Sequence, residues 1–228
     1  MRSFLALLAC IAPLAPPSAS AGPVRTAQAE AELLASRSAW VPGQAQWVAL
    51  RIQHDPGWHS YWINPGDSGL ATRLQWTLPE GFTVSAAEWP RPVRIQFGPL
   101  VNFGYEGELI VPIRVAVAKE VPRGGEQSLR LSAKWLICEE ICIPDGAELE
   151  LRLPVAEQAE PTAAAARIER AWAGLPRSWP QPARLAQTGE GDFVLELAAS
   201  PSLLPDPEVF PADAAFVEHG RGAAAVGG

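Results

Sequence analysis

The sequence predicts an all-β protein built as an immunoglobulin-like antiparallel β-sandwich, and three observations support this fold class. Short segments that alternate apolar and polar residues recur from about residue 30 to 155, turn clusters rich in glycine and proline separate them, and no helical pattern intervenes. Short strands at such spacing are typical of a sandwich, whereas a parallel sheet requires helical patterns between its strands.

Six segments carry the alternation most clearly. The expected strands are 45–53, 74–78, 82–89, 109–117, 128–138 and 147–155. The sequences DPG, NPGDSG, PEG, PRGGE and PDG supply turns between them. We therefore expect one immunoglobulin-like domain over 22–155.

Tryptophans within these segments are expected in the core. Trp47, Trp76 and Trp135 lie inside strand patterns, which favours packing over a carbohydrate-binding platform. The cluster formed by Trp58, Tyr61 and Trp62 lies just before a turn, and its role stays open at this point.

The composition changes after residue 155. The segment 156–176 is alanine-rich and charged, and we expect a linker and a short helix that starts near Thr162 and ends before Pro176. Residues 183–200 predict a β-hairpin with its turn at 189–191. We expect 177–228 to be a partial second β domain or a truncated segment.

Residues 1–21 have the features of a secretory signal peptide. Arg2 precedes an apolar run that is too short to span a bilayer, and small residues at 19–21 form a cleavage site. The mature chain is therefore expected to begin at Gly22.

Cleavage of this segment determines which sulfur atoms remain. It removes Met1, the one methionine, so that methionine ligation is excluded, and it removes Cys10, whose lipidation is the competing interpretation. Cys138 and Cys142 are then the remaining cysteines in an exported, oxidising compartment where disulfides persist.

The mature chain is acidic. The full chain has 18 Lys and Arg against 25 Asp and Glu, a net charge of -7, and loss of Arg2 with the signal gives the mature chain -8. There is no basic stripe, and the summed field repels phosphates, so no nucleic-acid partner is expected. No run of about 18 apolar residues follows the signal, so a membrane-spanning helix is not expected either.

The two cysteines lie four positions apart in WLICEEICIP, residues 135–144. If Cys138 ends one strand and Cys142 begins the next, their α-carbons are about 5.5 Å apart at a hydrogen-bonded position, which permits a disulfide. So short a loop gains little stability from a disulfide, because the entropic benefit grows with loop length. The spacing favours a redox-active pair, while a structural staple and a metal clip stay open.

Glu139 and Glu140 are expected to tune this pair. Negative charge beside a thiol disfavours the nucleophilic thiolate, although Lys134 offsets part of it. We therefore expect the pair to exchange when a partner's thiolate attacks it, or when docking changes the local field.

Copper binding is the second interpretation of the same residues. The sequence CEEIC matches the C-x-E-x-C core of binuclear copper sites, but residues 143–149 lack the histidine and methionine that such sites add. His54 and His59 could complete a Cys2His2 site only if the fold brings them to the cysteines. His59 lies among aromatic residues, where a hydrogen-bonded packing histidine is the commoner outcome, and His219 has no visible partner.

Four stretches taken in order resemble a known family. GWHSYWINPGDSGLATRLQW, EWPRP, FGPLVNFGYEGELIVPI and KWLICEEICIPDGAEL are similar to the amino-terminal periplasmic domain of DsbD-type thiol:disulfide interchange proteins, in particular the suppressor-of-copper-sensitivity B branch. The resemblance covers roughly 30–155. The combination of YW-x-NPGDSG with KWL-x-C-x3-C-x-P makes it specific.

The resemblance implies an immunoglobulin-like domain whose cysteine pair receives electrons from a membrane-embedded thiol reductase domain and reduces oxidised periplasmic thioredoxin-like proteins. It matches Cys138 and Cys142 to the redox pair and favours Cys142 as the residue that forms the mixed disulfide. It places Phe97 and Tyr105 where the family has a cap that shields the cysteines from water and small thiols.

Two departures from the family pattern limit the resemblance. The cysteines are closer together than in the best-studied branch. The chain also contains neither the membrane domain nor the thioredoxin-like carboxy-terminal domain, so we expect either a fragment or separately encoded partners. The resulting hypothesis is a periplasmic thiol–disulfide exchange module that needs no organic cofactor, and the alternative is a copper-binding or copper-tolerance module.

Overall fold

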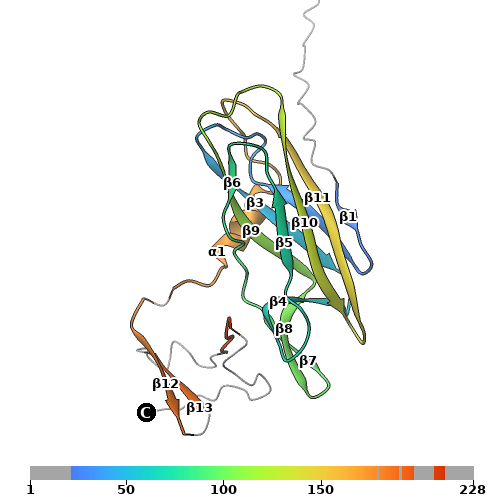
Figure 1. Cartoon of the computed structure of the whole chain (residues 1–228), viewed down its shortest axis with the longest axis vertical. Helices are drawn as coiled ribbons and strands as arrows, with labels where there is room; N and C mark the ends of the chain where they lie inside the picture. The colour runs from blue at the N-terminus through green and yellow to red at the C-terminus, as the bar shows by residue number, and fades with distance from the viewer. Residues whose placement is uncertain (1–21, 179, 190–191, 198–207, 214–228) are drawn as a thin grey trace, which may run out of the picture.

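The computed structural model describes residues 22–178, 180–189, 192–197 and 208–213. Within them the chain forms an antiparallel β-sandwich of two sheets, with one short helix against its side (Figure 1). The immunoglobulin-like fold class is confirmed. The predicted signal peptide, 1–21, lies outside the described residues.

The first sheet has the order β1-β2-β3-β9-β6, and every pairing in it is antiparallel. Its strands are β1 (Val24–Arg25), β2 (Ala29–Ala35), β3 (Ala45–His54), β6 (Phe82–Val84) and β9 (Glu108–Val117). Alternate residues of β2 are buried, because one face of this sheet lies on the core while the other is half-exposed.

The second sheet follows the path β11-β10-β4-β8-β7, with β5 paired to β10 beside that path. Its strands are β4 (His59–Gly66), β5 (Arg73–Thr77), β7 (Val93–Phe97), β8 (Leu100–Glu106), β10 (Glu126–Cys138) and β11 (Cys142–Pro154). The β10–β11 hairpin keeps one register along its whole length and ends at the pair Cys138–Cys142.

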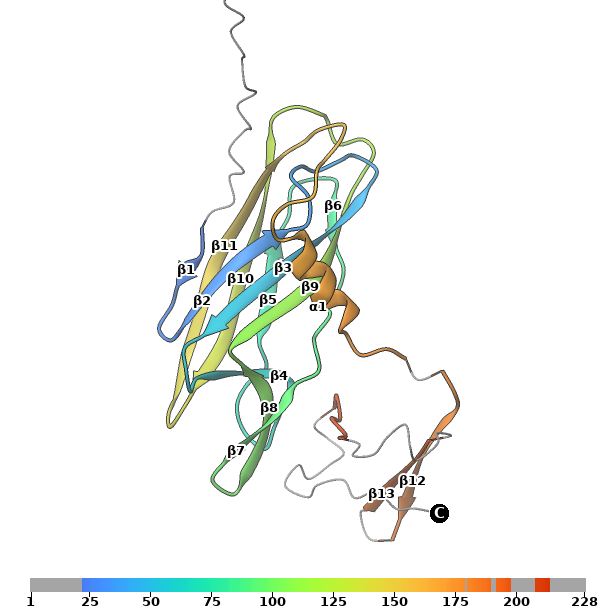
Figure 2. The same ribbon diagram turned by 180° about the vertical axis from the view of Figure 1, so that it is seen from behind.

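Strand β4 joins this sheet at the tip of the hairpin. β5 occupies the edge of β10 from Arg130 to Lys134, and β4 reaches β10 through the single register pair Cys138–His59. The strands β4, β8 and β7 therefore form a small extension at the cysteine end of the sandwich, as both views show (Figures 1 and 2).

Two of the three tryptophans expected in the core contribute to it, whereas Trp47 is half-buried outside the core and contacts Trp172. Trp135 is buried in the core between the sheets, and Trp76 is partly buried and packs against that core. Trp40 is fully buried, packs edge-to-face on Phe82, and donates its indole N–H to the carbonyl oxygen of Gln127 at 3.1 Å. This bond satisfies a polar atom that would otherwise be costly to bury.

Helix α1 (Ala165–Ala173) packs on β9 and β3, where Ile168 is buried and Trp172 contacts Trp47. It begins slightly later than expected, after the turn in which the Thr162 hydroxyl donates to the carbonyl oxygen of Ala35 and accepts from the backbone N–H of Ala164. None of the helices in the described residues has the length and apolar character needed to cross a membrane.

The predicted carboxy-terminal hairpin is present as β12 (Ala183–Thr188) and β13 (Asp192–Leu197). Gly189 begins its turn with a positive φ of 63°. The division of the chain into a first domain, a linker and a partial second domain stays a prediction.

Candidate redox site at the hairpin tip

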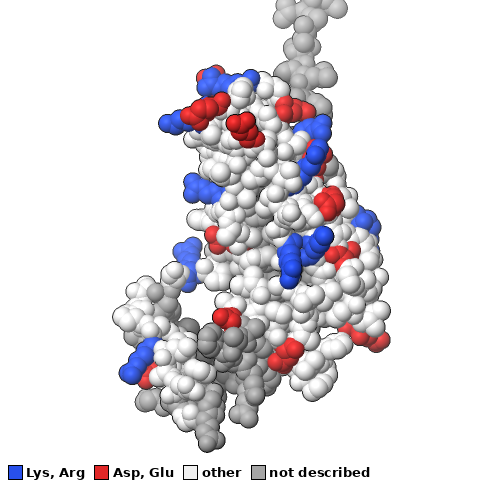
Figure 3. All heavy atoms as spheres, in the orientation of Figure 1, with Lys and Arg blue, Asp and Glu red and all other residues white. Residues whose placement is uncertain are grey.

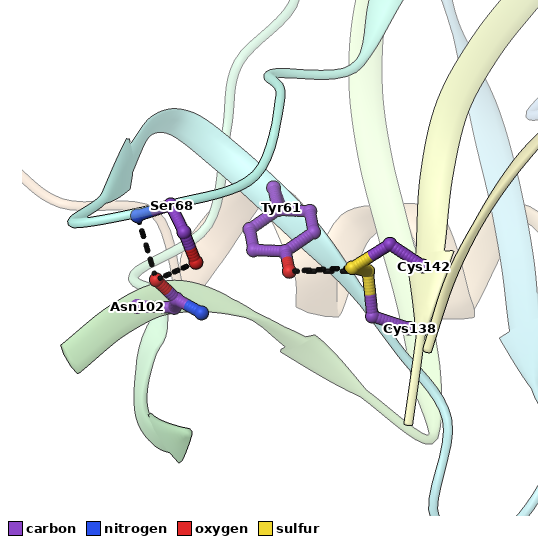
Figure 4. The surroundings of a disulfide bond; sticks show 5 residues. All are labelled: Tyr61, Ser68, Asn102, Cys138 and Cys142. Carbon is purple, nitrogen blue, oxygen red and sulfur yellow. Dashed lines mark hydrogen bonds between the residues drawn. A yellow bond between two sulfur atoms is a disulfide. The ribbon is translucent and has the colours of Figure 1, made fainter. Parts of the chain in front are cut away.

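Cys138 and Cys142 form a disulfide across the end of the β10–β11 hairpin (Figure 4). Their α-carbons are 4.2 Å apart, closer than the 5.5 Å expected for a hydrogen-bonded pair and near the spacing of about 4.5 Å that is usual for the narrow pairs of an antiparallel ladder. The loop between them is tight, because the backbone N–H of Glu139 donates to the carbonyl oxygen of Ile141 at 3.2 Å.

The two cysteines differ in their access to solvent. Cys138 is 1% exposed, because it ends a strand that is flanked by β11 and β4. Cys142 is exposed, since it begins the outer strand of the sheet. An attacking thiolate can therefore reach the sulfur of Cys142 more readily than that of Cys138.

Tyr61 is the aromatic residue that reaches the sulfur atoms. Its hydroxyl donates to Sγ of Cys138 at 3.1 Å and lies 3.5 Å from Sγ of Cys142. The side chain is 1% exposed, and burial raises the pKa of the phenol. Tyr61 therefore stays protonated at neutral pH and acts as a hydrogen-bond donor to the pair.

The segment between β4 and β5 covers the ring of Tyr61. Gly69 has a positive φ of 93°, and a Cβ there would lie 2.3 Å from Cε1 of Tyr61, so only glycine fits this position. The adjacent Ser68 is held by Asn102, whose side-chain oxygen accepts bonds at 3.0 Å from both the backbone N–H and the hydroxyl of Ser68 (Figure 4).

His59 lies on the same face of β4 as Tyr61 and directly opposite Cys138 in the register. Its ring packs edge-to-face on Tyr61 with 5.3 Å between centroids. It is 3% exposed, and among the described residues its Nε2 has no hydrogen-bond partner, contrary to the expectation of a hydrogen-bonded packing histidine. Burial lowers the pKa of His59, so the imidazole is neutral near pH 7.

His54 is the histidine that fits the packing role. Its Nδ1 lies 2.7 Å from the carbonyl oxygen of Gly107, which can only accept, so Nδ1 carries the proton and donates it in a hydrogen bond. Its Nε2 lies 2.8 Å from the Ser60 hydroxyl and accepts a hydrogen bond from it. Burial lowers the pKa of His54 as well. No group of three or more His, Cys, Asp or Glu in the described residues is placed to hold a metal ion.

The residues expected to cap the pair lie on the neighbouring strands. Phe97 ends β7 and is 38% exposed, just before the turn at Gly98. Tyr105 is buried on β8, where it stacks on Trp89 and donates its hydroxyl to the carbonyl oxygen of Pro90 at 2.8 Å. Burial raises the pKa of Tyr105. A shielding role for both residues stays a prediction.

The expected tuning residues lie at the exposed tip. Glu139 and Glu140 are exposed, and acidic side chains are visible where the hairpin ends (Figure 3). Glu139 also reaches back to the β3–β4 turn, since a Cβ at Gly57 would lie 2.6 Å from its Oε1. Beside them Ile141 is 66% exposed, which leaves an apolar side chain next to Cys142.

Sequence reasoning identified the cysteines and named His59 only as a possible metal ligand, and it did not identify Tyr61 or Gly69 as parts of the site. The missed signal was period-two alternation: His59 and Tyr61 are two positions apart and share one face of a strand, whereas Trp62 lies on the other.

Comparison with known proteins places the fold among thiol–disulfide proteins. The family model described as "Thiol:disulfide interchange protein DsbD, N-terminal" matches residues 30–154. No curated protein sequence matches the chain.

Two of the solved structures that are similar to this chain are thiol–disulfide family domains. The N-terminal periplasmic domain of ScsB from Proteus mirabilis is 21% identical with a TM-score of 0.50, and the match covers 69% of this chain and 59% of that one. The DsbD N-terminal domain of Neisseria meningitidis in the reduced form is 16% identical with a TM-score of 0.33, over 65% and 96% of the two chains. This chain therefore spans about 59% of the ScsB domain's length.

Proposed function

Because the chain belongs to the family of DsbD N-terminal domains, we propose that it is a thiol–disulfide exchange module in which Cys138 and Cys142 carry the reaction. One observation supports this proposal above the others. The pair is built asymmetrically, with an exposed sulfur at Cys142 and a buried sulfur at Cys138 that already accepts a hydrogen bond from Tyr61.

The disulfide of the oxidised module is reduced in two steps. A thiolate of an electron donor attacks Sγ of Cys142, the Cys138–Cys142 bond breaks, and Cys138 leaves as a thiolate. The donor's second thiol then attacks its own mixed-disulfide sulfur and releases Cys142 as a thiolate. The donor becomes a disulfide, and the module holds the two electrons as a dithiol.

Delivery of the electrons reverses these roles. The thiolate of Cys142 attacks a disulfide in the recipient and forms a mixed disulfide with it. Cys138 then attacks Sγ of Cys142, re-forms the intramolecular bond and frees the recipient as a dithiol. Cys142 is thus the residue that meets partners, and Cys138 is the one that resolves the complex.

Tyr61 and His59 support the buried cysteine in this scheme. A thiolate at Cys138 is a charge that has left water, and the Tyr61 hydroxyl at 3.1 Å supplies the hydrogen bond that such a charge requires. His59 is neutral and packs its ring edge-to-face on Tyr61, so its part in the scheme is to hold the tyrosine that donates to Cys138.

The family resemblance supplies the partners of the proposal. The electron donor is a membrane-embedded thiol reductase domain, in the same or a separate chain, and the recipients are oxidised thioredoxin-like proteins. The reaction takes place in the periplasm, the compartment named for the ScsB domain that shares the fold. The chemistry needs no organic cofactor, since the cysteine pair itself carries the electrons.

The reduction potential of the pair tests the function directly. Residues 22–228 are equilibrated in graded glutathione buffers, and the free thiols are alkylated and counted by mass. A midpoint between about -180 and -270 mV lies among exchange proteins and supports the proposal. A pair that stays oxidised below about -300 mV is structural, and the proposal then fails. Stoichiometric uptake of Cu(I) by the reduced pair would favour the copper interpretation instead.

A further inference from the structure

The back face of the β4–β8 pair holds a segment from far along the chain. Along these strands Tyr61 and Asn102 face the disulfide side, while Trp62 and Phe103 face the other way. Phe210 packs on that second face, with its ring centroid 6.4 Å from Trp62 and 5.4 Å from Phe103 at interplanar angles of 83° and 77°. Both contacts have the edge-to-face geometry that aromatic rings prefer.

Two arginines border the same aromatic surface. The guanidinium carbons of Arg91 and Arg94 lie 5.9 and 5.8 Å from the centroid of Phe210, within the range of cation–π contacts. Arg91 also forms an ion pair with Glu208 at 2.6 Å. The charge of the border is therefore complementary to an acidic residue two positions before the phenylalanine.

The backbone of the segment is held on both sides of Phe210. The Arg94 guanidinium donates to the carbonyl oxygen of Val209 at 3.3 Å. The amide of Asn64, which is 1% exposed, donates to the carbonyl oxygen of Pro211 at 2.8 Å. Two backbone contacts that flank one partly buried side chain fix the register of an extended peptide.

We propose that Trp62, Asn64, Arg91, Arg94 and Phe103 form a peptide-docking groove whose ligand is this chain's own segment Glu208–Asp213. The recognised pattern is an acidic residue, any residue, phenylalanine and proline. Val209 supplies the variable position, since its side chain is 38% exposed. Because the segment is tethered to the domain, it docks at a high effective concentration and needs little intrinsic affinity.

The position of the groove gives the docking a structural consequence. Trp62 follows Tyr61 directly, and Phe103 follows Asn102, so the docked segment packs against the same two strands that support the disulfide. The segment therefore packs on the face of β4 and β8 that points away from the disulfide and holds these two strands together. This inference does not depend on the redox function, because it rests on contacts on the opposite face of the strands.

The test compares two single variants of the 22–228 chain. Phe210→Ala removes the anchor, and Val209→Ala is the matched control, because its exposed side chain lies outside the groove. We expect Phe210→Ala, but not Val209→Ala, to shift the NMR signals of the Trp62 indole N–H and the Asn64 side-chain amide. The remaining signals report that both variants keep the fold.

A synthetic peptide with the sequence of residues 208–213 then probes the empty groove. It should restore the Trp62 and Asn64 signals of the Phe210→Ala chain saturably and leave the unaltered chain unchanged, because its groove is already occupied. Adding Arg91→Glu to the Phe210→Ala chain should lower its affinity for the peptide by about two- to fivefold, the effect of losing an exposed ion pair. Identical spectra for the two single variants, or equal peptide binding to the occupied and emptied grooves, overturns the proposal.

Discussion

The hydroxyl of Tyr61 lies 3.1 Å from Sγ of Cys138 and donates a hydrogen bond to it, although the two residues are 77 positions apart. This bond joins β4 to the tip of the β10–β11 hairpin at the place where the two strands pair through a single register position. The tip of a long hairpin would otherwise be free to fray. The disulfide is thus fixed by a side chain as well as by the sheet.

Replacing Cys138 or Cys142 with alanine should abolish exchange and leave the sandwich folded. A separation of four residues closes so small a loop that the chain-entropy model assigns the disulfide only about 2 kcal/mol of stability. Mixed-disulfide formation with an oxidised thioredoxin-like protein measures the activity, and urea unfolding measures the stability. Global unfolding of both variants would identify the bond as a structural staple.

Tyr61→Phe should make the pair more reducing. The hydroxyl stabilises a thiolate at Cys138 more than it stabilises the disulfide, and a hydrogen bond to a charged group contributes about 1.5–3 kcal/mol. At about 30 mV per 1.4 kcal/mol, the midpoint should fall by roughly 30 to 60 mV in glutathione buffers.

Tyr105→Phe is the control for this measurement, because its hydroxyl bonds to Pro90 instead of sulfur. It should lower stability slightly and leave the potential unchanged. A larger shift of the reduction potential in Tyr105→Phe than in Tyr61→Phe would contradict this prediction and favour Tyr105 as the residue that controls the pair.

The sequence predicted the long strands well because their alternation is regular and one face is buried. β3, β9, β10 and β11 lie within a few residues of the expected segments. β4 was not predicted, since four consecutive buried residues, His59 to Trp62, hide its period of two. Both faces of this strand are covered, because Tyr61 contacts Cys138 on one face and Trp62 packs on Phe210 on the other. Neither contact is visible in the local sequence.

The site was predictable only in part for the same reason. Cys138 and Cys142 are close in sequence, so their spacing alone indicates a hairpin pair. Tyr61 and Gly69 come from a distant strand and loop, and their contact depends on how β4 joins β10. From the sequence Gly69 indicates only a turn. The structure shows that a side chain at this position would collide with the ring of Tyr61.

Acidic pH should destabilise the protein through its buried histidines. Burial lowers the pKa of His54 and His59 below 6.5 in the folded state, so the unfolded chain binds more protons once the pH falls below about 6.5. Stability is therefore fully present above that pH and is lost as the pH decreases, by at most about 1.4 kcal/mol per pH unit for each histidine.

His59→Phe should remove about half of this dependence. The aromatic ring keeps the packing on Tyr61 and eliminates a buried nitrogen that has no hydrogen-bond partner in the described residues. Urea unfolding at pH 5.5, 6.5 and 7.5 measures the slope for both proteins. An unchanged slope would mean that His59 does not take up a proton on unfolding.

Gly69→Ala should slow reduction of the disulfide by small thiols. The added Cβ would lie 2.3 Å from the Tyr61 ring, and φ at this position is already positive, so the ring or the covering segment has to move. We expect glutathione to reduce the disulfide about tenfold more slowly, since loss of about 1.4 kcal/mol of the hydrogen bond from Tyr61 to the leaving Cys138 thiolate corresponds to that factor. Gly98→Ala is the matched control, with a positive φ of 59° and open space around its Cβ. Equal slowing in the two variants would show that backbone strain, and not displacement of Tyr61, changes the rate of reduction.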